Sequence, residues 1–163
     1  MEKLTTTQAG ASVFSDYGHI ASSLEGGFQA LKERFPDKHL ICIFQPHQIH
    51  RVLQGRDAFP KALKGYDETF IYSIYAAREN IQKNLIAFQN ICKEMGDNIS
   101  FPTTIDALGQ LFANHCGSNY LKTFDEVENI IEKADEKSII VVYSAGDIDY
   151  QLRKYIKGSV AFF

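Results

Sequence analysis

The sequence predicts an α/β protein with a doubly wound, mostly parallel sheet and helices on both faces. Two observations carry this prediction. Short apolar runs rich in β-branched and aromatic residues recur along the 163-residue chain, as in buried strands. Between these runs, apolar residues recur at three- and four-residue steps, which is typical of amphipathic helices. Because a parallel crossover needs about a dozen residues and usually uses a helix, this alternation favours a parallel sheet.

The first elements follow directly from these patterns. Strands are expected at residues 13–14, 39–44, 69–74 and 138–143. Helical spacing of apolar residues runs over 24–35, 121–131 and 148–156, with polar residues on the other faces.

The stretch between residues 80 and 120 holds further predicted elements. Apolar spacing predicts one helix over 81–95, a break at 96–98 and a second helix over 104–112. Thr103 or Thr104 is expected to cap the second helix, because a threonine oxygen accepts hydrogen bonds from free helical N–H groups. A short strand is expected around Tyr120.

Length and composition favour one domain over residues 11–163, with residues 1–10 as a polar tail or an interdomain connection. The net charge of −3 gives no broad basic surface for nucleic acid or an anionic membrane. No apolar run reaches the roughly 18 residues of a membrane span, and residues 1–10 lack the order of a signal peptide, so a cytoplasmic location is expected. The three cysteines are widely spaced, which favours neither disulfides nor a zinc site.

Polar side chains follow four of the predicted strands where each one ends. Because the carboxyl ends of parallel strands share one edge of a sheet, and ligands bind at that edge, these loops are expected to form one site. We call this set of loops the rim; it comprises residues 15–19, 45–51, 75–79 and 144–147. It would gather a carboxylate, a phenol, imidazoles and guanidinium groups, a mixture suited to a charged small molecule.

Several of these residues also have purely structural interpretations. Asp147 stands where a helix cap belongs, and Gly146 can serve a tight turn. Tyr75 can be packing at a strand end, while Arg78 and Glu79 can form a solvated ion pair. His39 and His115 lie outside the rim and are expected to be surface or structural residues.

Other chemistries find little support in the sequence. A metal site at His19, His47 and His50 is conceivable, but the spacing matches no known ligand pattern, and hydrogen bonding is favoured instead. Neither Ser15 nor Ser144 lies in a nucleophile elbow. The chain contains no G-x-x-x-x-G-K-[ST] loop, so it has no evident means of gripping and splitting ATP.

The rim motifs resemble those of the third domain of Mur ligases of the UDP-N-acetylmuramate:L-alanine type. The resemblance covers about residues 11–157 and rests on four strings in the family's order: SDYGH at 15–19, FQPH at 44–47 followed by Arg51, IYAARE at 74–79, and SAGDI at 144–148. It implies a Rossmann-like third domain of a three-domain, cytoplasmic ligase of peptidoglycan synthesis. The first domain would bind the UDP-sugar, and the central one would carry the phosphate-binding loop.

The resemblance also implies a reaction and a set of roles. The complete ligase would use ATP and Mg²⁺, bound mainly by the central domain, to join UDP-N-acetylmuramate to L-alanine in cell wall biogenesis. The third domain would close over the nucleotide and would be inactive alone. Asp16 and Tyr17 would contact adenosine, and His19, His47 and Arg51 would orient the amino acid, with Arg51 pairing its carboxylate. Arg78 and Asp147 are further rim candidates.

The chain departs from the family pattern at several positions. Ser15 replaces an Asp, Ile20 a His, Ala21 a Pro and Gln48 an Arg, and residues 80–98 look like an insertion. Losing one guanidinium from a carboxylate clamp removes a contact worth about 1.5 to 3 kcal/mol. Two alternatives therefore stay open beside the ligase domain: a stand-alone small-molecule-binding module without ligase activity, and a related Mur ligase that adds a peptide.

Overall fold

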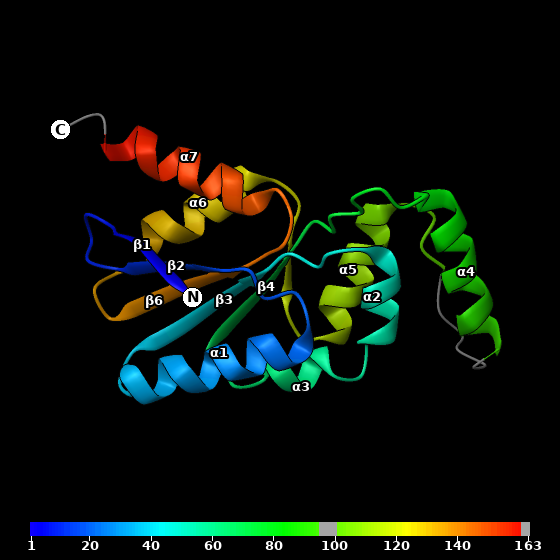
Figure 1. Ribbon diagram of the computed structural model, residues 1–163, viewed down its shortest axis with the longest axis horizontal. Helices are drawn as coiled ribbons and strands as arrows, with labels where there is room; N and C mark the ends of the chain where they lie inside the picture. The colour runs from blue at the N-terminus through cyan, green and yellow to red at the C-terminus, as the bar shows by residue number, and fades with distance from the viewer. Residues whose placement is uncertain (95–100, 161–163) are drawn as a thin grey trace.

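A six-stranded sheet forms the centre of the molecule (Figure 1). The computed structural model describes residues 1–94 and 101–160. The strand order is β1-β2-β6-β3-β4-β5, and every neighbouring pair is parallel except β1 with β2. The strands are β1 (Glu2–Thr6), β2 (Ser12–Asp16), β3 (His39–Phe44), β4 (Glu68–Tyr72), β5 (Asn119–Leu121) and β6 (Ser138–Tyr143).

Helices cover both faces of this sheet. They are α1 (Ala21–Arg34), α2 (Ile49–Gln54), α3 (Phe59–Leu63), α4 (Ile81–Glu94), α5 (Ile105–His115), α6 (Phe124–Lys133) and α7 (Ile148–Val160). No helix among the described residues is long and apolar enough to cross a membrane.

The core lies in two layers, one on each side of the sheet. One layer packs apolar residues of α1 to α5, such as Leu24 and Phe112, against Phe44 and other strand residues. The other packs α6 and α7, through Val127 and Leu152, on the opposite face. Burial on both faces is why the strand sequences read as continuous apolar runs rather than as alternating ones. The predicted α/β fold with helices on both faces is confirmed.

The predicted helices and strands are largely found in the structure. Thr104 caps α5, since its hydroxyl accepts a hydrogen bond from the Ala107 N–H at 3.1 Å. The strand expected around Tyr120 is β5, and the helix expected over 81–95 is α4 through Glu94. The break expected at 96–98 lies outside the described residues.

Residues 1–10 are not simply the polar tail or connection that the sequence predicted. Glu2–Thr6 form β1, which pairs antiparallel with β2 at the edge of the sheet. An edge strand faces solvent and carries little apolar signal, so the pattern of apolar residues did not indicate β1. Arg153 on α7 fastens β1, because its guanidinium donates to both carboxylate oxygens of Glu2.

Two short helices, α2 and α3, were not predicted from the sequence. They lie between β3 and β4, and α4 packs beside α2 at the end of the molecule (Figure 1). Helices this short depend on tertiary contacts for their stability. For α2, those contacts are the buried side chains of Ile49 and Val52 in the core and hydrogen bonds to the rim loop after β4.

Candidate functional site

The four strands expected to end together do so. β2, β6, β3 and β4 are consecutive parallel neighbours within the sheet, so the loops after Asp16, Tyr143, Phe44 and Tyr72 leave one edge. Backbone hydrogen bonds continue the pairing past these ends: Ser144 N donates to Asp16 O at 2.9 Å, and Gln45 N donates to Tyr143 O at 2.9 Å. The rim predicted from the sequence is therefore one continuous edge.

Four aromatic rings form a chain along the rim. The ring centroids of Tyr17 and His19 are 5.5 Å apart, and those of His19 and His47 are 5.9 Å apart, both edge to face. The His47 ring then stacks on Tyr75 at 5.8 Å. Three of these residues were predicted site residues, while Tyr75 had been considered equally as strand-end packing. Tyr17 at the outer end is 74% exposed, so its ring has a free face.

The loops after β3 and β4 bind one another closely. Tyr75 N donates to Pro46 O at 2.9 Å, Gln48 N donates to Tyr75 O at 2.8 Å, and His47 and Tyr75 form an isolated parallel bridge. Gln48 has a φ of 75° and Ala77 a φ of 53°, and these are the positive-φ residues other than glycine in the described chain. Such backbone conformations cost free energy and persist where surrounding contacts hold them, often at functional sites.

The electrostatics of His47 favour a neutral ring. Burial is the main cause that lowers the pKa of His47 below its ordinary value, and electrostatic interactions with Arg51 and with the His19 ring lower it further. Its Nδ1 atom is buried and has no hydrogen-bond partner among the described residues. A neutral imidazole has one nitrogen that accepts and one that donates, so His47 can serve a polar ligand group in either sense.

Arg51 lies on α2, one turn beyond Gln48. Its charge acts on His47, yet its guanidinium has no ion pair or hydrogen bond in the described part of the chain. A guanidinium without a partner beside a neutral imidazole is suited to bind a carboxylate.

Asp16 begins the first rim loop. Its Oδ1 accepts from Gly18 N at 2.8 Å, which closes a tight turn and brings Tyr17 to the surface. Its Oδ2 lies 2.8 Å from the Met1 amine.

Asp147 takes part in a network that sequence reasoning missed, centred on Gln45. Gln45 is 2% exposed, and its Nε2 donates to Asp147 Oδ1 at 2.7 Å and to Ser73 O at 3.3 Å. Its Oε1 accepts from Ser144 Oγ at 2.7 Å and from Ile148 N at 3.2 Å. One amide thus joins the ends of β3, β4 and β6 to the start of α7. A polar residue directly after a buried apolar run was the available signal.

Arg78 makes no hydrogen bond or ion pair with the other predicted rim residues in the part of the chain that the structure describes. It is exposed in the loop after β4, and it does not pair with Glu79 as its structural interpretation proposed. Glu79 turns instead to α2, where its carboxylate lies 2.5 Å from His50 Nδ1.

The remaining histidines make structural contacts. His39 Nε2 lies 2.7 Å from Glu68, and His115 Nε2 lies 3.0 Å from the backbone oxygen of Arg56. Within residues 1–94 and 101–160, no three His, Cys, Asp or Glu side chains cluster closely enough to hold a metal ion.

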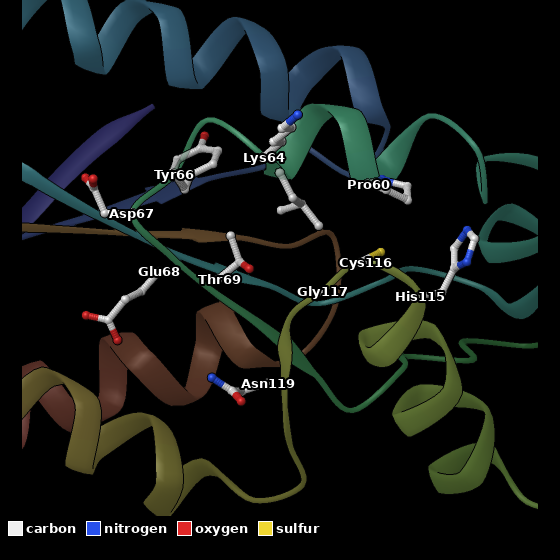
Figure 2. Close-up of a pocket in the computed structure, with 11 residues that line it drawn as sticks. Pro60, Lys64, Tyr66, Asp67, Glu68, Thr69, His115, Cys116, Gly117 and Asn119 are labelled. Atoms are coloured by element: carbon white, nitrogen blue, oxygen red, sulfur yellow. The ribbon is translucent and has the colours of Figure 1, made fainter.

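A hollow of about 590 Å³ lies away from the rim, between α3, the start of β4 and the turn from α5 to β5 (Figure 2). Asp67 and Glu68 on its wall precede or begin β4, so it opens near the amino end of that strand rather than at its carboxyl end. Both carboxylates are already engaged, Asp67 by Leu40 N and Glu68 by His39. We therefore place the candidate site at the rim.

Comparisons with known proteins find similar sequences among Mur ligases. A UDP-N-acetylmuramate–L-alanine ligase of Aquifex aeolicus is 27% identical over 146 residues, which are 89% of this chain and 27% of the relative. One from Lactobacillus delbrueckii subsp. bulgaricus is 40% identical over 68 residues, 41% of this chain and 16% of the relative. The chain resembles a Mur ligase carboxy-terminal domain. The chain spans about a quarter of the length of relatives such as the Aquifex aeolicus ligase, and no family model matches it.

Solved Mur ligase structures share the fold. A UDP-N-acetylmuramate–alanine ligase of Thermotoga maritima superposes with a TM-score of 0.59 at 20% identity, covering 99% of this chain and 30% of that one. A murein peptide ligase of Psychrobacter arcticus superposes with a TM-score of 0.60 at 17% identity, covering 95% of this chain and 29% of that one. The α/β architecture of the Mur ligase carboxy-terminal domain is therefore the architecture of this chain.

Proposed function

We propose that this chain acts as the carboxy-terminal domain of an ATP-dependent ligase that joins UDP-N-acetylmuramate to L-alanine in peptidoglycan synthesis. The observation that carries the proposal is the convergence of Tyr17, His19, His47 and Arg51 on one sheet edge, in the part of the chain that resembles these ligases. The domain would close over the nucleotide and place the amino acid, and it would be inactive alone.

Asp16 and Tyr17 would contact the adenosine part of ATP. The exposed Tyr17 ring offers a free face on which a base can stack, a contact worth about 1 to 3 kcal/mol where it has been measured. Asp16 holds the turn that presents this ring, and its carboxylate is an acceptor for ribose hydroxyls. ATP and Mg²⁺ would be bound mainly by parts of the ligase that this chain does not match in its relatives.

His19, His47 and Arg51 would orient the amino acid. The Arg51 guanidinium would pair with the amino-acid carboxylate, and the neutral His47 ring would accept a hydrogen bond from its amino group. Both contacts place the amine for attack on an activated carboxyl group. Positioning of this kind lowers the barrier by removing the entropy cost of bringing two reactants together.

A domain exchange tests the proposal. The equivalent segment of the Aquifex aeolicus ligase is replaced by this chain, and phosphate release that depends on L-alanine is measured. We expect activity, and we expect Arg51→Ala to raise the KM for alanine by about tenfold to hundredfold, because a charge-assisted contact is lost. Arg56→Ala is the matched control: Arg56 follows α2 and faces the exposed Asp57, so its loss should change KM by less than about twofold.

A titration of the chain alone adds a second measurement. Mg-ATP is expected to shift the NMR signals of Tyr17 and His19. A folded hybrid without L-alanine-dependent phosphate release would refute the ligase role, whatever the response of the chain alone, because ATP is bound mainly by the parts that the chain does not match. Tight binding of an unrelated metabolite would favour the stand-alone binding module instead.

A ligase that adds a peptide is the second candidate. It is favoured by Gln48, which stands where the resemblance leads us to expect a second guanidinium for an amino-acid carboxylate, and by the fold shared with a murein peptide ligase. A panel of amino acids and short peptides assayed on the hybrid separates the two candidates. Strict use of alanine eliminates the peptide version.

A further inference from the structure

Glu79 is a nearly buried carboxylate in the loop after β4, with a side chain only 9% exposed. Its Oε2 accepts from Ile49 N at 2.6 Å, and its Oε1 accepts from His50 N at 3.4 Å and lies 2.5 Å from His50 Nδ1. A buried carboxylate is costly unless both oxygens are bonded. Among the described residues, all the groups that the Glu79 carboxylate binds belong to Ile49 and His50, the first two residues of α2.

The amino end of α2 has no cap of its own. Gln48 precedes the helix with a φ of 75° and makes no side-chain capping bond. The first N–H groups of a helix have no partner within it, so an outside acceptor must bind them. Glu79 supplies that acceptor from another loop, and it complements the positive end of the helix.

The anchored segment is the one that carries the proposed amino-acid contacts. His47 lies two residues before Ile49, and Arg51 lies two residues after it. At the other end of its loop, Tyr75 stacks on His47 and bonds the backbone on both sides of that residue. The loop of 75–79 therefore grips the segment 46–51 at two points, with the positive φ of Ala77 making the turn between them.

We propose that Glu79 is a positioning residue of the rim, whose carboxylate sets the place of His47 and Arg51 by holding the start of α2. The inference rests on the proposed function for the role of His47 and Arg51 as amino-acid contacts. Glu79 itself would touch neither nucleotide nor amino acid.

The test uses the 163-residue chain and the ring-proton NMR signals of His47, which respond to the Tyr75 stack. Glu79→Ala removes the anchor, and it should shift and broaden these signals. In the hybrid ligase the same substitution should raise the KM for L-alanine by about tenfold or more. Glu79→Gln keeps one acceptor for Ile49 N–H and is expected to restore the His47 signals largely. Should Glu79→Ala not fold, Glu79→Asp keeps the charge but shortens the reach, and the same His47 shift is expected.

Glu126→Ala is the matched control. Glu126 also binds N–H groups at a helix start, since its Oε2 accepts from Lys122 N at 2.7 Å and Thr123 N at 2.9 Å, but α6 lies on the other face of the sheet. Its loss should lower the unfolding temperature and leave the His47 signals unchanged.

The outcomes separate the two proposals. His47 signals that stay in place in a folded Glu79→Ala or Glu79→Asp variant overturn the positioning role, as do signals that move equally in Glu126→Ala. A folded hybrid ligase without L-alanine-dependent activity counts against the ligase function, while the His47 signals of the 163-residue chain still decide whether Glu79 sets the geometry.

Discussion

Replacing Gln45 by leucine should destabilise the protein more than any exposed glutamine can. Leucine keeps a similar volume but removes an amide that makes four hydrogen bonds while only 2% exposed. The Ser144 hydroxyl and the Ile148 N–H are both buried, and each loses its acceptor. A buried donor left without a partner costs about 1 to 3 kcal/mol, so we expect the free energy of unfolding to fall by about 3 kcal/mol.

Urea denaturation followed by circular dichroism measures this loss. In a chain of this length, the expected change corresponds to an unfolding temperature lower by roughly 6 to 12 °C. Gln110→Leu is the control, because Gln110 lies exposed on α5 and its side chain bonds the exposed side chain of Asn114. The cost of this substitution should stay within about 0.5 kcal/mol. A Gln45→Leu loss below about 1 kcal/mol, with an unchanged urea dependence, would show that the amide does not hold the strand ends together.

Two further predictions follow from the packing and the electrostatics. Gly27→Ala should lower the free energy of unfolding by about 1 to 3 kcal/mol, because the added Cβ would lie 1.8 Å from the Tyr143 hydroxyl. Gly26→Ala is the control: its Cβ would meet nothing within 4 Å, so it should stabilise α1 by about 0.5 to 1 kcal/mol. Equal effects in thermal unfolding would contradict the close approach of Gly27 to Tyr143. The NMR titration midpoint of His47 should lie below 6.5 and rise in Arg51→Ala. The folded state then binds this proton less readily than the unfolded chain, so the contribution of His47 to stability is complete above pH 6.5 and declines as the pH falls below it. A titration midpoint above 6.5 would contradict the lowered pKa of His47.

The sequence predicts most of the sheet because its inner strands are buried on both faces. Runs such as 39–44 and 138–143 are apolar after their first residue and need no tertiary information to be recognised. β1 could not be predicted in this way, because Lys3 and Thr6 lie on an edge strand that is held by pairing with β2. α2 could not be predicted either, because the carboxylate that binds its first N–H group belongs to Glu79, thirty residues away in the chain.

The rim could be predicted in outline but not in its bonding. Parallel strands bring their carboxyl ends together whatever the loops contain, which is why Tyr17, His19 and His47 were expected to meet. Which partner a polar side chain takes depends on distances that spacing does not encode. Sequence spacing predicts an ion pair of Glu79 with its neighbour Arg78, whereas the structure shows Glu79 bound to His50. The hydrogen bonds of Gln45 to Ser144 and Asp147 join residues about a hundred positions apart.

The two outer strands limit how this sheet can grow between molecules. β1 has five residues and an irregular register, and β5 has three. A strand from a second chain would find few backbone groups in line on either side, so intermolecular sheet extension gains little. Assembly with other protein surfaces is then left to side-chain contacts, such as those the loops around Tyr17 and Arg51 present.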